Sequence, residues 1–418
     1  MIKRRIGAAV AAGPGDVRAV APSRPWVTLA LCSAAAVLEG FDNQSMGVAA
    51  PRLIAQFGLS AAQAGVIFSA ATLGLFVGAA VGGRVADHVG RKRALAVSLL
   101  LFGLFSLLTA AAAGAQSLFA ARLLTGLGLG GAMPNFISLA SESTPANRRL
   151  SAVTVVMAGM PFGGAIAGLM ALGATLGWGW RAIFVVGGAA PLGLAAMIGL
   201  LLPESPPARI VAGPNASEVE SVASVLFGAG RAATTGLLWT GFFFTQLVLL
   251  LMLNWLPSLM IGLGFTRTEA SLASICFNVS GSLGAIVLGR LHAGRHRRPW
   301  VIITYSGMAV ALAGVSAVGA DFAIAALACA LAGAFIIGAQ LILFALAPLY
   351  YQFRMRGTGV GAAVALGRLG SVIGPLFAGG LLARGGGSTT VLLAIVPFVV
   401  VGGSAAYALT WRKQVLDP

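Results

Sequence analysis

Charged side chains are scarce in this chain. Its 418 residues are 58% hydrophobic and only 9% charged, whereas about a quarter of an ordinary soluble domain is charged. This composition excludes a soluble protein with a single core, and the hydrophobic excess excludes intrinsic disorder. Three Cys residues are too few for a disulfide scaffold, and we expect them to act as small hydrophobic side chains.

The sequence contains many long runs of apolar residues. Each run is about 20 residues long, the length that crosses a bilayer as a helix. The polar segments between them do not divide the chain into the short alternating strands of a membrane barrel. The predicted spans are 26–50, 62–83, 93–113, 117–140, 149–172, 180–202, 234–258, 268–289, 299–320, 322–347, 357–382 and 389–411. The sequence therefore predicts an all-α membrane protein with twelve transmembrane helices.

The positive charge lies on one side of the predicted membrane. The net charge is +16, and most Lys and Arg residues fall in the tails and loops on the side of the two termini. The loops on the other side hold only Arg52, Arg181, Arg267 and Arg384. Because basic loops stay in the cytoplasm, we predict that both termini are cytoplasmic. Topology and attraction to anionic membrane lipid explain the basic charge, so nucleic acid is not an expected partner.

The chain divides into two halves of nearly equal length. The expected parts are a cytoplasmic tail at 1–25, six spans at 26–202, a cytoplasmic linker at 203–233, six spans at 234–411 and a second tail at 412–418. Two similar bundles can rock about a site at their interface and expose it to one side of the membrane at a time. Two pseudo-symmetric six-helix bundles therefore favour a transporter over a passive scaffold.

The loop between spans 2 and 3 combines glycine, aspartate and basic residues at fixed spacing. The pattern consists of Gly83, Asp87, Gly90, Arg91 and Lys92. It resembles the Gly-x-x-x-Asp-x-x-Gly-Arg-Lys signature of the major facilitator superfamily. The resemblance implies a twelve-helix transporter in which this loop clamps the cytoplasmic gate when the protein faces outward. A loop that served topology alone would need the basic residues but not the Gly and Asp spacing.

Three ionisable residues lie inside predicted spans of the first half. Glu39 and Asp42 share one face of span 1, because residues three apart are neighbours on a helix. A charged residue inside hydrocarbon costs about 2.5–3.5 kcal/mol, so we expect this face to line a water-filled cavity, where crowding and desolvation favour reversible proton uptake. The helix rise places Arg122 at a similar depth. We predict that Arg122 pairs with Asp42 or Glu39 in one state and is released by protonation or by an anionic substrate; a static buried ion pair is the alternative.

Arg368 lies near the midplane of span 11 and has no basic counterpart in the first half, where Met160 takes the equivalent place. A guanidinium offers a planar fork of two donors that suits a carboxylate. Arg368 is therefore the candidate for binding a substrate carboxylate. The alternative is that Arg368 only donates to backbone carbonyls.

The segment Glu39-Gly40-Phe41-Asp42 resembles the acidic-Gly-x-Asp motif in the first span of the aromatic acid:proton symporters, although most members have Asp where this chain has Glu39. Similar segments occur in both halves, and within the family they are most similar to 3-(3-hydroxyphenyl)propionate transporters. These segments include Ala121–Gly126, Leu202–Ser205, Asn254–Pro257, Ala345–Tyr350 and Gly357–Gly370. The resemblance implies proton-coupled import of an aromatic carboxylate across a bacterial inner membrane.

Several other polar and aromatic residues could contact such a substrate by stacking on a ring or by bonding a phenol hydroxyl. They are Asn135, Asn254, Trp255, Gln340 and Tyr350. Plain packing and helix-to-helix hydrogen bonding are the commoner uses of such residues in membrane spans.

Two other functions compete with import. A proton-driven exporter of drugs or metabolites is the nearest, but Gly159–Gly164 matches the exporter motif only in part, with Met160 before Pro161. A membrane enzyme would need a nucleophile with a base, or a metal cluster, and the three His residues lie in basic loops. We therefore expect no enzymatic activity, no cofactor and no metal. We expect a monomer whose partners are an aromatic carboxylate, protons and membrane lipid.

Overall fold

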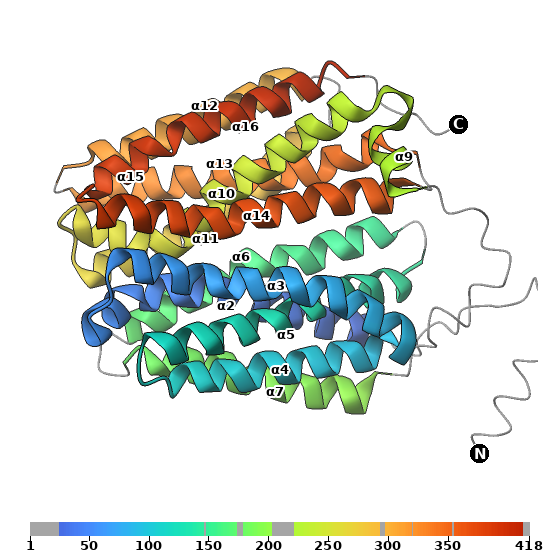
Figure 1. Cartoon of the computed structure of the whole chain (residues 1–418), viewed down its shortest axis with the longest axis horizontal. Helices are drawn as coiled ribbons and strands as arrows, with labels where there is room; N and C mark the ends of the chain where they lie inside the picture. The colour runs from blue at the N-terminus through green and yellow to red at the C-terminus, as the bar shows by residue number, and fades with distance from the viewer. Residues whose placement is uncertain are drawn as a thin grey trace, which may run out of the picture.

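A computed structural model describes residues 25–145, 148–173, 179–202, 221–292, 297–319, 321–352 and 355–412, and its helices run side by side (Figure 1). The long helices are α2 (Pro25–Phe57), α3 (Ala61–Val89), α4 (Arg91–Ala110), α5 (Ala115–Glu142), α6 (Arg149–Gly173), α7 (Arg181–Leu201), α10 (Ala232–Gly262), α11 (Arg267–His292), α12 (Arg297–Ala317), α13 (Phe322–Leu346) and α14 (Arg356–Ala383). The short ones are α9 (Val222–Phe227), η3 (Gly228–Gly230), η4 (Ala347–Tyr350), α15 (Ser388–Ala394) and α16 (Val396–Leu409). Residues 1–24 of the predicted N-terminal tail, 203–220 of the predicted linker and 413–418 of the predicted C-terminal tail lie outside the described residues.

Among the described residues, eleven spans are long and apolar enough to cross a membrane. The remaining predicted span, the first, corresponds to α2. This helix is 33 residues long, but Glu39, Asp42 and Gln44 near its centre make it less apolar. All three side chains are at most 2% exposed, so they face neighbouring helices rather than lipid. α2 therefore completes the twelve-helix all-α fold that the sequence predicts.

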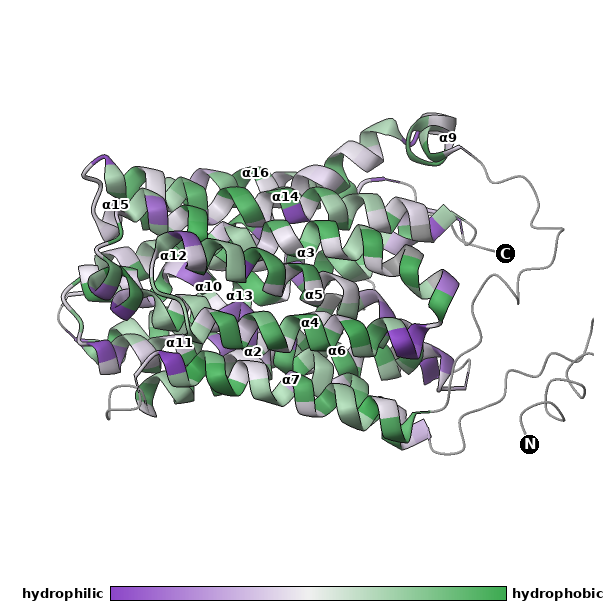
Figure 2. Cartoon of the chain, turned by 60° about the horizontal axis from the view of Figure 1, so that its bottom comes forward, coloured by the Kyte–Doolittle hydropathy of each residue, from purple (hydrophilic) through white to green (hydrophobic). Residues whose placement is uncertain are grey.

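The surface of the helices matches a lipid environment. Hydrophobic residues cover most of each helix, and hydrophilic residues gather toward both ends (Figure 2). Large apolar side chains such as Val155, Leu200 and Val310 are at least 67% exposed. Apolar side chains at such exposure are stable against hydrocarbon rather than water.

The helices form two bundles that meet along a seam. In Figure 1 the helices α2–α7, coloured blue to green, lie below α10–α16, coloured yellow-green to red. Across the seam α3 packs against α14, α6 against α11, and α2 against α10. With twelve spans, α2 begins and α16 ends at the same face of the protein, which we call the terminal face. The other face is called the opposite face.

Glycine allows the closest helix packing in the first bundle. A Cβ at Gly126 in α5 would collide with the backbone carbonyl of Ala71 in α3, and a Cβ at Gly130 would collide with that of Leu75. Only residues without a Cβ let two helix backbones approach this closely. Gly126 and Gly130 thus belong to a packing surface of α5, the helix of predicted span 4.

Candidate functional site

The predicted gating loop is the tight junction between α3 and α4. Gly90 lies between α3 and α4 and has a φ of 92°. Glycine adopts this backbone conformation more readily than other residues, which explains why the signature has a glycine at this position. Arg91 then forms an ion pair with Glu142 at the end of α5, with 3.1 Å between Nε and Oε1. Both side chains are partly exposed, and such pairs contribute little to stability.

The other signature residues are placed only in part. Gly83 and Asp87 lie in α3, and Lys92 lies in the first turn of α4. The side chain of Asp87 is outside the described part of the structure. The gating role of this loop therefore stays a prediction.

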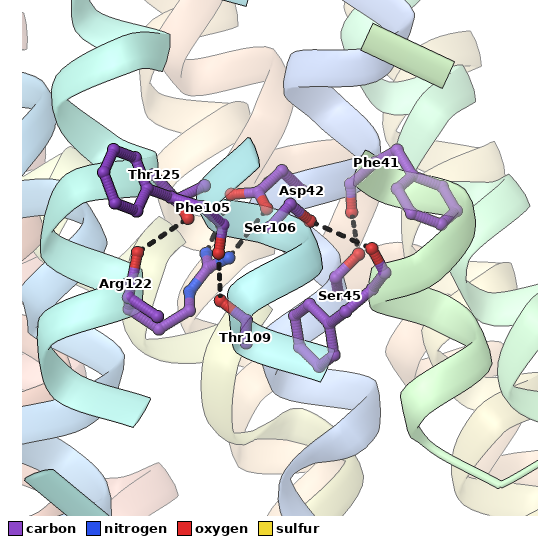
Figure 3. A network of polar contacts seen from close by, with 10 residues as sticks. Phe41, Asp42, Ser45, Phe105, Ser106, Thr109, Arg122 and Thr125 are labelled. Carbon is purple, nitrogen blue, oxygen red and sulfur yellow. Dashed lines mark hydrogen bonds and ion pairs between the residues drawn. The ribbon is translucent and has the colours of Figure 1, made fainter. Parts of the chain in front are cut away.

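Arg122 and Asp42 form a buried, two-pronged ion pair (Figure 3). Nη1 of Arg122 lies 2.7 Å from Oδ1 of Asp42, and Nη2 lies 2.8 Å from Oδ2. Both residues are 2% exposed, and the guanidinium lies 5.7 Å from the ring centre of Phe184. Parallel donor bonds of this kind are the strongest way for Arg to hold a carboxylate. The pairing that the sequence predicts is confirmed for Asp42.

The hydroxyl groups around this ion pair bond to backbone carbonyls (Figure 3). Ser45 and Thr125 donate to carbonyls one turn back in their own helices, and Ser106 of α4 donates to the carbonyl of Phe184 in α7. These bonds satisfy the hydroxyls without drawing on the carboxylate. Asp42 thus holds Arg122 as its charged partner.

Glu39 lies one turn before Asp42 and has a different environment. It is 1% exposed, and neither of its carboxyl oxygens has a hydrogen-bond partner among the described residues. The charges that act on it are those of Arg368 in the other bundle and of Asp42. The two carboxyl groups therefore differ. Asp42 is fully paired with Arg122, whereas Glu39 is buried without a hydrogen-bond donor among the described residues.

Arg368 lies in the middle of α14 and reaches across the seam. Its Nη2 lies 3.1 Å from the thioether sulfur of Met133 in α5. Sulfur of this kind is a weak acceptor. The alternative in which Arg368 serves backbone carbonyls finds no such bond in the part of the chain that the structure describes. The guanidinium of Arg368 therefore has N–H donors that could bond a stronger acceptor than the thioether.

Close packing of α14 on α10 brings Gln246 level with Arg368. A Cβ at Gly367 would lie 3.2 Å from Cγ of Gln246 and 3.4 Å from Cβ of Phe242. Arg368 is the next residue in α14, and α10 and α14 both run from the terminal face to the opposite face. Gln246 is 6% exposed. Sequence reasoning missed this residue, although an amide in the middle of a mostly apolar span was a usable signal.

Packing of α2 on α10 brings Glu39 to the same level. Gly47 in α2 lies directly against the backbone of Asn254 in α10. Glu39 precedes Gly47 by as many residues as Gln246 precedes Asn254, and the two helices run in the same direction. Glu39, Gln246 and Arg368 therefore lie at a similar level near the middle of the seam, with Asp42 one helix turn away from Glu39.

The remaining predicted substrate residues separate into two groups. Asn135 and Asn254 are buried and donate to carbonyls of their own helices, at Gly131 and Leu250. Gln340 differs, because neither atom of its side-chain amide has a partner within the described ranges, although it is only 5% exposed.

The two predicted aromatic residues have structural partners. Trp255 donates from Nε1 to the carbonyl of Pro375 at 3.1 Å, and its ring packs edge-on against Phe68 of the other bundle. Tyr350 donates to the carbonyl of Leu409 at 2.7 Å, close to the terminal face. These contacts favour packing, so we leave Trp255 and Tyr350 out of the proposed substrate site.

The bundles are joined by hydrogen bonds in the half toward the opposite face. Ser69 of α3 donates to the carbonyl of Val372 in α14 at 2.7 Å. Gln44 of α2 donates to the carbonyl of Leu253 in α10 and accepts from Asn278 in α11. Sequence reasoning missed these contacts, which tie the two bundles together in this half of the protein.

Comparison with known proteins supports the family and the fold. The sequence model of the Major Facilitator Superfamily matches residues 32–375. The chain is 42% identical to the 3-(3-hydroxy-phenyl)propionate transporter of Escherichia coli, over 95% of this chain and 96% of that one. It is 32% identical to the gallate transporter of Pseudomonas putida, over 89% and 90% of the two chains.

Solved structures show the same fold at low identity. The D-xylose-proton symporter superposes with a TM-score of 0.75 at 20% identity, covering 92% of this chain and 96% of the other. A bacterial homologue of the lysosomal transporter Spinster, solved facing inward, gives 0.76 at 16% identity, with 93% and 97% covered. The similar proteins are transporters, so the membrane-enzyme alternative is set aside. The chain is a member of the major facilitator superfamily.

Proposed function

We propose that this protein is a proton-coupled importer of an aromatic carboxylic acid, such as a 3-hydroxyphenylpropionate or a hydroxybenzoate, working by alternating access. Several relatives are named for the transport of aromatic acids. The high identity to one of them over nearly the whole of both chains supports this substrate class. Monomers in a bacterial inner membrane are the proposed form.

The terminal face is the cytoplasmic face in this proposal. Support comes from the basic residues, which concentrate in the tails and loops on that side. The opposite face, where the bundles are joined by Ser69, Gln44 and Asn278, is then the outer face. We infer from these bonds that the described conformation is closed to the outside, which is one step of alternating access.

Arg368 carries the proposal for substrate binding. It is a cation near the middle of the seam, its described partner is a weakly accepting thioether, and its level is shared by groups from both bundles. A substrate carboxylate would accept two parallel hydrogen bonds from it. Displacing Met133 would leave little unsatisfied, because the sulfur bond that is lost is weak.

Glu39 and Asp42 carry the proposal for proton coupling. A buried carboxyl group without a donor, such as Glu39, is far less costly when neutral than when ionised, so we assign Glu39 a proton in this conformation. Asp42 is instead held by Arg122 in the two-pronged ion pair. An anion bound at Arg368 would remove the positive charge that acts on Glu39, and this links substrate binding to proton binding.

Uptake by proteoliposomes tests this function and its direction. We expect vesicles that contain the protein, with acid outside, to accumulate labelled 3-(3-hydroxyphenyl)propionate, and to stop when an ionophore removes the proton gradient. The inserted orientation is assigned by proteolysis of the tails. Accumulation that is equal with and without the gradient would refute the coupling. Net movement only from the cytoplasmic face outward would favour the exporter.

A further inference from the structure

Unpartnered buried polar atoms concentrate in a few residues. Five of the eight such side-chain atoms among the described residues belong to Glu39, Gln246 and Gln340. Most buried polar atoms of a folded protein have a hydrogen-bond partner, so each exception requires an explanation. A proton on Glu39 lowers the cost of burying its carboxyl group, although it supplies no hydrogen-bond partner. The two glutamines carry no charge that a proton could remove, so their unpartnered amide atoms require another explanation.

Gln246 and Gln340 lie at a similar level in the second bundle, near that of Arg368. The rings of Phe242 in α10 and Phe344 in α13 pack edge-on, with their centres 5.2 Å apart. Gln246 lies four residues after Phe242, and Gln340 lies four residues before Phe344. Because α10 and α13 run in opposite directions, both glutamines lie about 6 Å from this ring pair toward the opposite face.

We propose that Gln246 and Gln340 form a subsite that binds the ring hydroxyl of an aromatic carboxylate whose carboxyl group is held by Arg368. The inference rests on the proposed function and deepens it by naming which part of the substrate these residues recognise. Arg368 is next to Gly367, against which Gln246 packs, so carboxyl and hydroxyl partners lie on neighbouring helices. Phe242 and Phe344 provide apolar surface beside the subsite.

The chemistry of an amide pair fits a phenol hydroxyl. A phenol both donates and accepts, and a glutamine side chain offers one acceptor and two donor hydrogens. Among the described residues, the buried carbonyl oxygen of Gln246 has no partner, and neither the carbonyl oxygen nor the amide nitrogen of Gln340 has one. One phenol hydroxyl can therefore donate to one glutamine and accept from the other.

The subsite gives selectivity as well as affinity. A site built to bond a hydroxyl rejects the analogue that lacks it, because the polar groups of the protein stay buried and unpaired. An apolar pocket would discriminate much less. The glutamines therefore select hydroxylated aromatic acids over acids with an unsubstituted ring.

Binding of two matched acids tests the subsite. The purified full-length protein is titrated with 3-(3-hydroxyphenyl)propionate and with 3-phenylpropionate, which lacks the hydroxyl. The variants are Gln246→Met and Gln340→Met, which keep the side-chain size and remove the amide. We expect each variant to bind the hydroxylated acid about 10-fold more weakly, the typical loss for one hydrogen bond, and to bind 3-phenylpropionate as well as or better than the unaltered protein.

A third variant separates this role from general damage. Gln44→Met removes another buried amide, but one that already bonds Leu253 and Asn278, so it is expected to change the binding of both acids by the same factor. Equal losses for both acids in Gln246→Met and Gln340→Met would overturn the subsite and leave the proposed function standing. If the unaltered protein binds neither acid, the proposed function fails and the inference fails with it.

Discussion

Asn278 in α11 donates a hydrogen bond of 3.0 Å to Gln44 in α2, and this bond joins the two bundles at a buried position. Gln44 also donates to the carbonyl of Leu253 in α10 at 3.1 Å. It follows Asp42 by only two residues in the same helix. One helix therefore carries both the ion pair with Arg122 and the contacts that tie the two bundles together, so we expect movement of one to affect the other.

Removing these bonds is expected to open the opposite face. Gln44→Met deletes both cross-bundle bonds, each of which contributes about 0.5–1.5 kcal/mol. Spin labels at Ala62 and Arg384, which lie near the opposite-face ends of α3 and α14, would report a larger population of long distances. Gln63→Met, which removes a cap bond within the first bundle, serves as the control. An unchanged distance distribution in Gln44→Met would show that these bonds do not hold the face closed.

Arg368 is expected to be necessary for substrate affinity. Arg368→Gln removes the charge and should weaken binding of an aromatic carboxylate by at least about 100-fold, because each of the two proposed charged hydrogen bonds contributes about 1.5–3 kcal/mol. Arg368→Lys keeps the charge but loses the planar fork, so an intermediate loss is expected. Arg384→Gln in the loop after α14 is the control. Equal affinity in Arg368→Gln and the unaltered protein would remove Arg368 from the site.

The Asp42 and Arg122 pair predicts a strong non-additivity in stability. Asp42→Asn leaves the Arg122 guanidinium buried without a counter-charge, which costs about 3–5 kcal/mol. Adding Arg122→Gln removes that unpaired charge, so the double variant should melt at a higher temperature than Asp42→Asn alone. Thermal unfolding of purified Asp42→Asn, Arg122→Gln and the double variant in one detergent checks this. Losses that simply add would mean that the two groups do not depend on each other.

Glycine packing predicts a contrast between two chemically identical substitutions. Gly126→Ala introduces a methyl group into the carbonyl of Ala71, whereas Gly236 in α10 has open space around the same position. We expect Gly126→Ala to lower the yield of folded protein and its melting temperature, and Gly236→Ala to leave both unchanged or slightly raised, because alanine favours helices. Size-exclusion chromatography and thermal melts are the measurements. Equal behaviour of the two variants would contradict the packing.

The sequence predicts those features that depend on a single helix or on depth in the membrane. The spans follow from runs of apolar residues, and the pairing of Arg122 with Asp42 or Glu39 follows from the cost of burying each charge alone; the structure selects Asp42. The shared level of Gln246 and Gln340, and the hydrogen bond between Asn278 and Gln44, depend on helix rotation and crossing, which leave no periodic signal around a single amide. Trp255 and Tyr350 were candidates for the substrate by residue type alone, and only their partners in the fold favour packing.

Glu39 is expected to separate substrate exchange from proton coupling. Glu39→Gln keeps the size of the side chain and its neutral form, so the variant can still close around substrate, but it has no proton to release. We therefore expect proteoliposomes of this variant to exchange labelled for unlabelled aromatic acid at a rate near that of the unaltered protein, and to show no accumulation driven by a proton gradient. Glu269→Gln, which alters an exposed cap at the start of α11, is the control and should keep both activities. Accumulation by Glu39→Gln at the unaltered level would assign the coupled proton to another group, and Asp42→Asn in the same assay would then decide whether its pair with Arg122 is static.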